Sequence, residues 1–194
     1  MFERRTDYPT AVTSSDDDGI VEGFRWCVSH REDGDSLAVW THQKNNLGNN
    51  PKLESIVDYY DLDHITARGG GSLRHGGSVL MAWADPNDIA AFMKFNSERV
   101  RALCLISWDE DRLAPWVAMM DAELLGNLRG WSPVVPDFHP VVLEEPGHLT
   151  TSINHNNTIT GGYEKDDVVR VLLDLYDAGY ELDGQSMSAW ATAN

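Results

Sequence analysis

The sequence predicts an α/β domain: a mixed sheet of about five strands with flanking helices and a C-terminal helix pair, with the α+β class as the alternative. Short apolar runs of strand length alternate with stretches in which apolar residues recur at helical spacing. The order strand, helix, strand, helix over residues 78–126 indicates at least one right-handed βαβ unit. At 194 residues, 42% hydrophobic and 24% charged, the chain is long enough for one well-buried domain.

The first part of the chain is predicted to be a leader followed by a hairpin. Residues 1–19 contain few large apolar groups and end in Asp-Asp-Asp-Gly, which is typical of a mobile leader. The segment "GFRWCVSH" (23–30) alternates apolar and polar residues, as a half-buried strand does, and "SLAVWTHQ" (36–43) has a similar character. Since "REDGD" between them has turn chemistry, we expect the two strands to pair.

The α/β core is expected to occupy residues 20–129. Within it, "KLESIVDYYDL" (52–62) places apolar residues at helical spacing, and "SVLMAWA" (78–84) is an apolar run of buried-strand length. A helix is expected over 85–96, where Asp85 and Pro86 are typical entry residues. Next come a strand over 100–108 and a helix over 111–126 that ends at a glycine.

The C-terminal third is predicted to be a loop-rich crossing (130–162) and a helical appendage packed on the core (163–194). The crossing is rich in Pro, Ser, Thr and Asn, with an edge strand expected near Val141–Leu143. In the appendage one helix stops at Gly179 and a second begins near Gln185. The second helix contains no Lys or Arg, which argues against a DNA-reading helix-turn-helix.

Charge and cysteine content restrict the classes of partner. The formal net charge is −16, with 31 Asp and Glu against 15 Lys and Arg, so direct nucleic-acid binding is not expected. The acid excess fits a solubilising surface or an acidic mimic of nucleic acid. No apolar run reaches membrane-spanning length, and Cys27 and Cys104 lie in apolar runs as buried free thiols do. We therefore expect a cytoplasmic protein that does not bind a membrane.

The loop of residues 64–77 is the main candidate site. It belongs to one of three windows without a carboxylate (36–53, 64–84 and 146–163), which together contain five of the seven histidines. Glycines let backbone amides approach a ligand closely, and guanidinium groups grip carboxylate or phosphate. The alternative is a flexible hairpin tip between strands near 64–67 and 78–83. The predicted ligand-binding residues are Arg68, Gly69, Gly70, Gly71, Arg74, His155 and Asp109, and the predicted acid–base residues are His42 and His75.

Strong catalytic and cofactor motifs are lacking in the sequence. The glycines of "ARGGGSLRHGG" match neither the P-loop nor the dinucleotide-binding fingerprint, and no G-x-S-x-G elbow occurs. Two short clusters could each supply two ligands to a metal ion: Asp61, Asp63 and His64 in the first, and Asp137 and His139 in the second. Neither spacing is a strong metal signature, and a third ligand is unassigned in both. We therefore predict no metal and no cofactor.

Three functional hypotheses follow. The first is an α/β module that binds a partner protein or a small ligand through its loop-rich edge. The second is an enzyme acting on an anionic or nucleotide-like small molecule, which requires His42, Arg68, Arg74 and His75 to share one cleft. The third is the acidic mimic, which rests on net charge alone.

Overall fold

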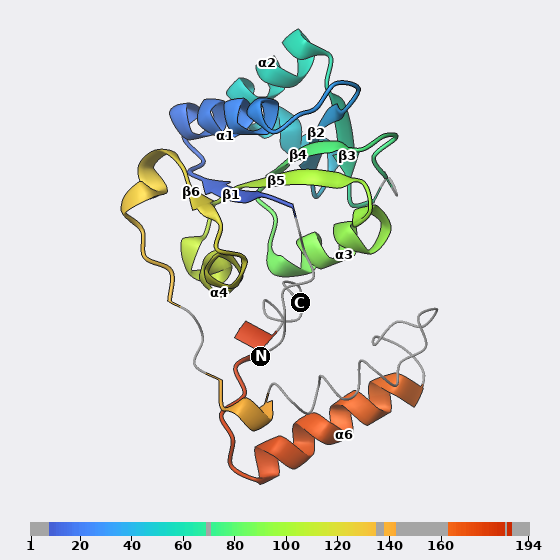
Figure 1. Cartoon of the computed structure of the whole chain (residues 1–194), viewed down its shortest axis with the longest axis vertical. Coiled ribbons are helices and arrows are strands. Elements are labelled where there is room, and N and C mark those ends of the chain that lie inside the picture. Colours follow the sequence, from blue (N-terminus) through green and yellow to red (C-terminus); the bar gives the residue numbers. More distant parts are fainter. Residues whose placement is uncertain (1–7, 69–70, 135–137, 143–162, 185, 188–194) are drawn as a thin grey trace. The chain divides into compact units, whose positions relative to one another are not determined.

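A computed structural model describes residues 8–68, 71–134, 138–142, 163–184 and 186–187 (Figure 1). The chain divides into two compact units. The first contains a sheet and its flanking helices up to residue 134, and the second contains helix α6.

The first unit is built on a parallel sheet of six strands. The strands are β1 (Thr10–Thr13), β2 (Ser36–Thr41), β3 (Asp63–Thr66), β4 (Gly77–Ala82), β5 (Val100–Ile106) and β6 (Glu123–Leu124). Their order across the sheet is β3-β2-β4-β5-β1-β6, and every pairing is parallel. The α/β class is thus confirmed. However, the expected mixed sheet is parallel throughout, with β2 paired to β3 and β4 instead of to a hairpin partner.

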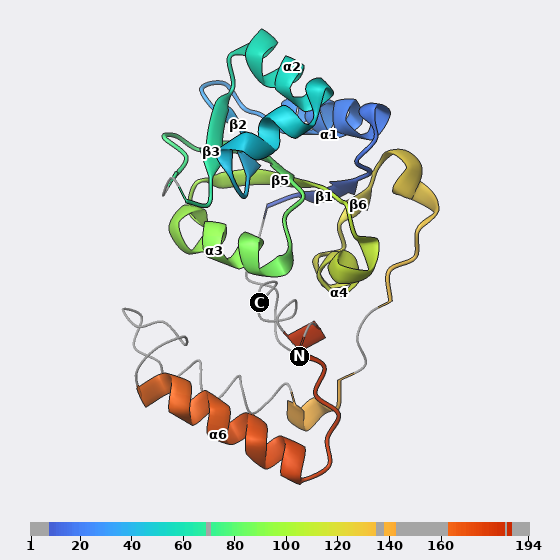
Figure 2. The ribbon, with the colours of Figure 1, turned by 180° about the vertical axis from the view of Figure 1, so that it is seen from behind.

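Helices cover both faces of this sheet, as two opposite views show (Figure 1, Figure 2). They are α1 (Asp17–Ser29), α2 (Pro51–Tyr60), α3 (Pro86–Asn96) and α4 (Glu110–Met120), with 3-10 turns η1 (Lys44–Asn49) and η2 (Gly126–Gly130). Helices α1 and α2 pack on one face around Phe24, Leu53 and Leu80. Helices α3 and α4 pack on the other around Trp40 and Trp116. Because both faces are covered, the central strands are nearly continuous apolar runs.

Two expectations for the N-terminal region are wrong. Residues 10–13 of the supposed leader form β1, a fully buried strand between β5 and β6. The segment 23–30 belongs to α1 and is no strand. Asp16 caps this helix by accepting a hydrogen bond from the amide of Gly19 at 2.8 Å, and Ile20, Phe24 and Cys27 form its buried face at spacings of four and three.

The later strand–helix order is as predicted. The unit β4–α3–β5 confirms the expected βαβ arrangement, and α4 follows β5. Strands β3 and β4 are not joined as a hairpin, because β2 lies between them. Neighbouring strands β2 and β4 lead into helices on opposite faces, namely α2 and α3. A place where neighbouring strands lead into helices on opposite faces is called a switch point. In parallel sheets, ligands usually bind there, at the carboxyl ends of the strands.

The second unit is described around α6 (Tyr163–Asp177). The helix stops as predicted: Gly179 has φ +86 and the amide of Tyr180 donates to the carbonyl of Leu175. The rings of His139 and Tyr180 lie 4.8 Å apart. Residues 140–142 are helical where an edge strand was expected, and residue 143 lies outside the described residues. Residues 184 and 186–187 are helical, in the region of the expected second helix. In the described part of the chain, no helix has the length and apolarity that crossing a membrane requires.

Candidate functional site

Three helices that begin at the carboxyl edge of the sheet are capped by an aspartate. The cap accepts a backbone amide in each case: Asp16 from Gly19 at 2.8 Å, Asp85 from Asp88 at 3.0 Å and Asp109 from Arg112 at 3.2 Å. The amide of Gly19 lowers the pKa of Asp16 below its usual value, so this cap is ionised at neutral pH. Phosphate-binding folds use such helix ends for the ligand. Here carboxylates occupy them, so the edge disfavours phosphate.

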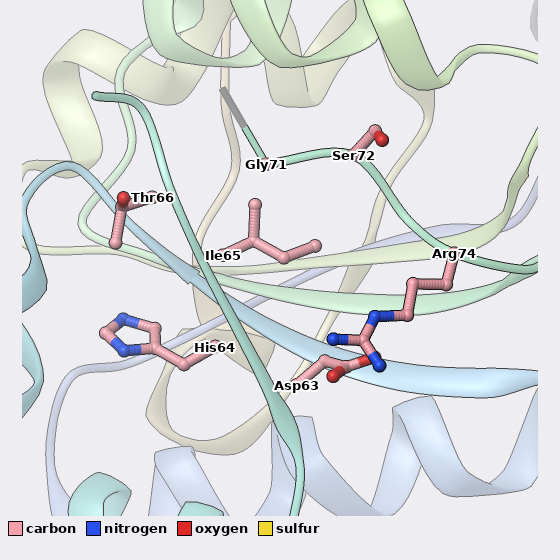
Figure 3. Close-up of a pocket in the computed structure, with 7 residues that line it drawn as sticks. All are labelled: Asp63, His64, Ile65, Thr66, Gly71, Ser72 and Arg74. Carbon is pink, nitrogen blue, oxygen red and sulfur yellow. The ribbon is translucent and has the colours of Figure 1, made fainter. Parts of the chain in front are cut away.

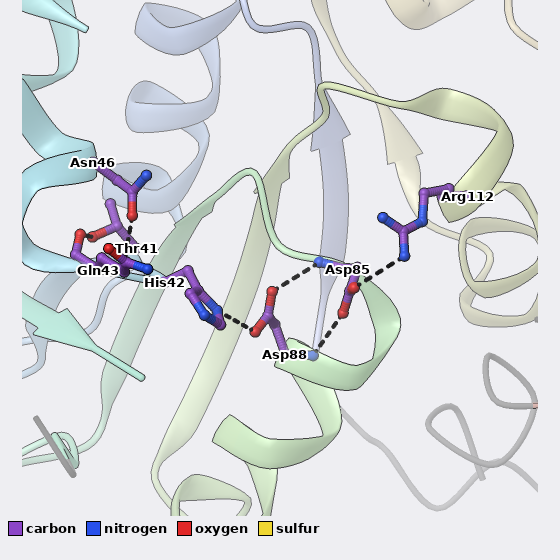
Figure 4. A network of polar contacts seen from close by, with 7 residues as sticks. All are labelled: Thr41, His42, Gln43, Asn46, Asp85, Asp88 and Arg112. Atoms are coloured by element: carbon purple, nitrogen blue, oxygen red, sulfur yellow. Dashed lines mark hydrogen bonds and ion pairs between the residues drawn. The ribbon is translucent and has the colours of Figure 1, made fainter. Parts of the chain in front are cut away.

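A histidine–aspartate pair lies at the switch point between β2 and β4 (Figure 4). His42 follows β2, and its Nδ1 lies 2.9 Å from Oδ1 of Asp88 on the first turn of α3. The other Asp88 oxygen accepts the backbone amide of Asp85 at 3.3 Å. The Asp85 carboxylate in turn accepts from the guanidinium of Arg112 at 3.3 Å. Asp88 is therefore held by the cap of α3, and it orients the imidazole of His42.

The hydrogen bond to Asp88 determines which ring nitrogen of His42 is available. A carboxylate acceptor at Nδ1 requires the proton there, which makes Nε2 the acceptor in the neutral ring. Within the described chain, no group hydrogen-bonds to Nε2. The His42 side chain is 53% exposed and that of Asp88 18%. The pair thus has an oriented basic nitrogen that solvent or a ligand can reach.

A cavity of about 280 Å³ lies beside the edge strand β3 (Figure 3). Strand β3 forms one wall and the coil that leads to β4 forms the other. The lining residues are Asp63, His64, Ile65, Thr66, Gly71, Ser72 and Arg74. A Cβ on Gly71 would lie 2.6 Å from Cγ2 of Ile65, so only glycine lets the coil approach the strand this closely.

Two opposite charges face this cavity without pairing. Asp63 comes from the start of β3 and Arg74 from the coil. In the part of the chain that the structure describes, neither side chain forms an ion pair. The cavity therefore has one anionic and one cationic group available to a ligand.

His64 adds a neutral imidazole to the same wall. The hydroxyl of Thr41 donates to the carbonyl of Gln43 at 2.8 Å, so its oxygen must accept from Nε2–H of His64, also at 2.8 Å. Burial lowers the pKa of His64, and the nearby positive charge of Lys44 lowers it further. At neutral pH the ring is therefore uncharged, with Nδ1 as an acceptor.

The depressed pKa of His64 predicts a loss of stability in mild acid. Its folded-state pKa lies below the ordinary value of 6.5, so the unfolded chain binds this proton more readily. The stability that the neutral His64 ring contributes is present in full above about pH 6.5, and it declines as the pH falls through that value toward the folded-state pKa. In urea titrations, His64→Gln should show a smaller fall in unfolding free energy than the wild type over this range. An equal fall would contradict the prediction; His75→Gln controls for the loss of an exposed imidazole.

The predicted site residues do not all come together. Arg74 and Gly71 line the cavity beside β3, whereas Arg68 is exposed and lines none of the described cavities. Asp109 caps α4. Gly69, Gly70 and His155 lie outside the described residues.

The two predicted acid–base residues lie at opposite ends of neighbouring strands: one at the amino ends of the sheet's strands and the other at their carboxyl ends. Ser36 at the start of β2 is opposite Gly77 at the start of β4. His75 precedes β4 at the amino edge and His42 follows β2 at the carboxyl edge, about 20 Å away at ~3.3 Å per residue. The single cleft required for His42, Arg68, Arg74 and His75 does not form.

Sequence reasoning missed the partners that complete each site. Asp88 is the third helical residue after an Asp-Pro helix start, a position where an acid often closes a capping box. Asp63 was weighed only as a metal ligand, although it opens the edge strand β3 directly before the candidate loop. Among the described residues, no three His, Cys, Asp or Glu side chains gather as metal ligands would.

Comparison with known proteins gives a match over the C-terminal part of the chain. Residues 138–194 match a protein family described as a domain of unknown function (DUF1889). The match covers well under half of the chain and begins after the sheet ends. No curated protein and no solved structure matches the chain.

Proposed function

We propose that the first unit binds a small ligand that carries both a carboxylate and an ammonium group, such as a free amino acid, in the cavity beside β3. The supporting observation is that Asp63 and Arg74 face one cavity without pairing with each other. A ligand with both charges would satisfy the two residues at once. This is the small-ligand form of the loop-binding hypothesis, with Arg74 and Gly71 of the 64–77 loop retained.

The chemistry of the walls matches the two ends of such a ligand. The guanidinium of Arg74 can hold a carboxylate through two parallel hydrogen bonds, with the hydroxyl of Ser72 nearby. Asp63 and Nδ1 of His64 can both accept hydrogen bonds from an ammonium group. The volume of about 280 Å³ is at the small end of ligand pockets, which favours a single small molecule over a peptide.

Thermal-shift and calorimetric titrations with L-amino acids, matched carboxylates without the amine and matched amines without the carboxylate test this proposal. Amino acids should raise Tm most, because a ligand at about a hundred times its Kd adds ~2.7 kcal/mol of stability. Arg74→Gln and Asp63→Asn should each weaken binding by about tenfold to a hundredfold, the range expected for a hydrogen bond to a charged group.

The chain offers a matched control for each substitution. Arg68→Gln removes an exposed arginine from the same loop, and Asp61→Asn removes an acid two residues before Asp63. Neither Arg68 nor Asp61 lines the cavity. Both controls should bind as the wild type does. The proposal is wrong if no amino acid binds, or if Arg74→Gln and Arg68→Gln bind equally well.

A further inference from the structure

Aromatic side chains form an exposed row where α1 and α2 lie side by side on one face of the sheet (Figure 1, Figure 2). The row starts at Phe24 of α1, which is buried, and its ring centroid lies 4.8 Å from that of Tyr60, the last residue of α2. The ring of Tyr59 meets that of Tyr60 at 79°, again with 4.8 Å between the centroids. Tyr59 is 81% exposed, and Tyr60 and Val28 are exposed as well. We call Phe24, Val28, Tyr59 and Tyr60 the tyrosine patch.

Negative charge is concentrated at the end of α2, beside this patch. Asp58 precedes the two tyrosines in the last turn of the helix, and Asp61 follows them as its C-cap. That turn contains no basic residue, although cations are what stabilise a helix C-terminus. Within the part of the chain that the structure describes, neither aspartate forms an ion pair. The two charges therefore do not serve the helix, and they stay available next to exposed rings.

The charges also indicate which occupant fits the patch. A second copy would bring the same two aspartates to the contact, and each chain has a formal net charge of −16, so like charges oppose self-association. A lysine or arginine side chain is attracted both by the carboxylates and by the faces of the tyrosine rings. Tyrosine also gives a large contact area at a low cost in side-chain entropy, which suits it to protein interfaces.

From this juxtaposition we propose that the tyrosine patch docks a basic, amphipathic segment of a partner protein. Apolar side chains of that segment cover Tyr59 and Tyr60, and its cationic side chains lie beside Asp58 and Asp61. Contiguous apolar surface with a charged rim is typical of such a contact. The patch shares no residue with the cavity beside β3, so the proposal does not depend on amino-acid binding.

Fluorescence anisotropy of a labelled peptide of alternating lysine and leucine, titrated with the full chain, tests the proposal. The peptide should bind, and its Kd should rise with salt, because salt screens the attraction between exposed charges. A peptide of alternating glutamate and leucine reverses the charge, and one of alternating lysine and serine lacks the apolar side chains. Both should bind more weakly by about tenfold or more, the effect expected when central contacts of an interface are lost.

Tyr59→Ser tests whether the exposed ring anchors the peptide. The substitution should raise the Kd of the lysine–leucine peptide by about tenfold or more, as the loss of an aromatic anchor does. Tyr176→Ser is the matched control, because Tyr176 is a tyrosine of α6 that is 68% exposed and also lies between aspartates in the sequence. This control should bind the peptide as the wild type does.

Paired substitutions separate the charge at the patch from the charge of the whole chain. Asp58→Asn combined with Asp61→Asn removes two charges at the patch, and Asp174→Asn combined with Asp177→Asn removes two from α6. The first pair should raise the Kd of the lysine–leucine peptide about fivefold, as the loss of two exposed charge contacts does. The second pair should leave it almost unchanged.

Four results would overturn the proposal. They are absence of binding by the lysine–leucine peptide, equal binding by either of the other peptides, equal Kd values for the two serine variants, and equal Kd values for the two paired variants. A dimer of the full chain in analytical ultracentrifugation that Tyr59→Ser dissociates would assign the patch to a second copy and likewise overturn it. Arg74→Gln should leave peptide binding intact, so this test is separable from that of amino-acid binding beside β3.

Discussion

Gly77→Ala is expected to destabilise the first unit by about 3 kcal/mol or more, at the upper end of the cost of overpacking. A Cβ at this position would lie 2.1 Å from the backbone oxygen of Ser36 and 2.8 Å from its carbonyl carbon. These atoms belong to β2, directly across the ladder from Gly77. A bulge between β4 and β5 begins at the same residue. The extra carbon can therefore be accommodated only if β2, β4 and β5 move apart.

Urea denaturation followed by circular dichroism measures this cost, with Gly130→Ala as the matched control. Gly130 ends η2, and a Cβ there would meet no atom within 4 Å. The control should unfold within about 0.5 kcal/mol of the wild type, as surface substitutions usually do. Equal midpoints for the two variants would show that β2 and β4 tolerate the extra carbon.

Trp40→Ala should cost about 3–5 kcal/mol, the usual range for removing a buried tryptophan side chain. Trp40 is 2% exposed and lies at the centre of the core that β2 forms with α3 and α4. The surrounding residues belong to different strands and helices, so they can close the resulting void only in part.

The matched control for Trp40→Ala is Trp108→Ala. Trp108 lies two residues after the end of β5 and is 56% exposed, with the guanidinium of Arg112 6.0 Å from its ring centroid. Its removal should cost less than about 1 kcal/mol, since little apolar area returns to water. A comparable loss of stability in the two variants, measured by urea titration, would mean that Trp40 does not anchor the core.

The sequence predicted the second half of the sheet well and the first half poorly. Segments 78–84 and 100–108 are nearly continuous apolar runs, and Asp85-Pro86 marks the helix between them, so β4, α3 and β5 are visible in the pattern. The segment 23–30 has apolar residues that satisfy both a two-residue and a helical period, and its cap at Asp16 lies seven residues earlier. Strand β1 has only four residues, two of them threonine, so no local signal marks it as buried.

The candidate sites depended on neighbours that local patterns cannot reveal. Arg74 and Gly71 were predicted from the composition of their loop, and the structure places both in one cavity wall. Their counterpart Asp63 is the first residue of the edge strand β3, and it shares a cavity with Arg74 only because the segment after β3 runs back along that strand. His42 and His75 were grouped by residue type alone. Because β2 and β4 run parallel, His75 before β4 and His42 after β2 lie at opposite ends of these strands.

The position of β1 has a consequence for biosynthesis. Its sheet neighbours β5 and β6 begin at Val100 and Glu123, so the ribosome must add most of the first unit before β1 can pair. At ~5–20 residues per second, the 87 residues from Thr13 to Val100 correspond to roughly 4–17 s. During that interval β1 has neither of its two sheet neighbours to pair with. Shortening this delay, for example by circular permutation that places β1 after β5, would let the sheet assemble from its centre outward.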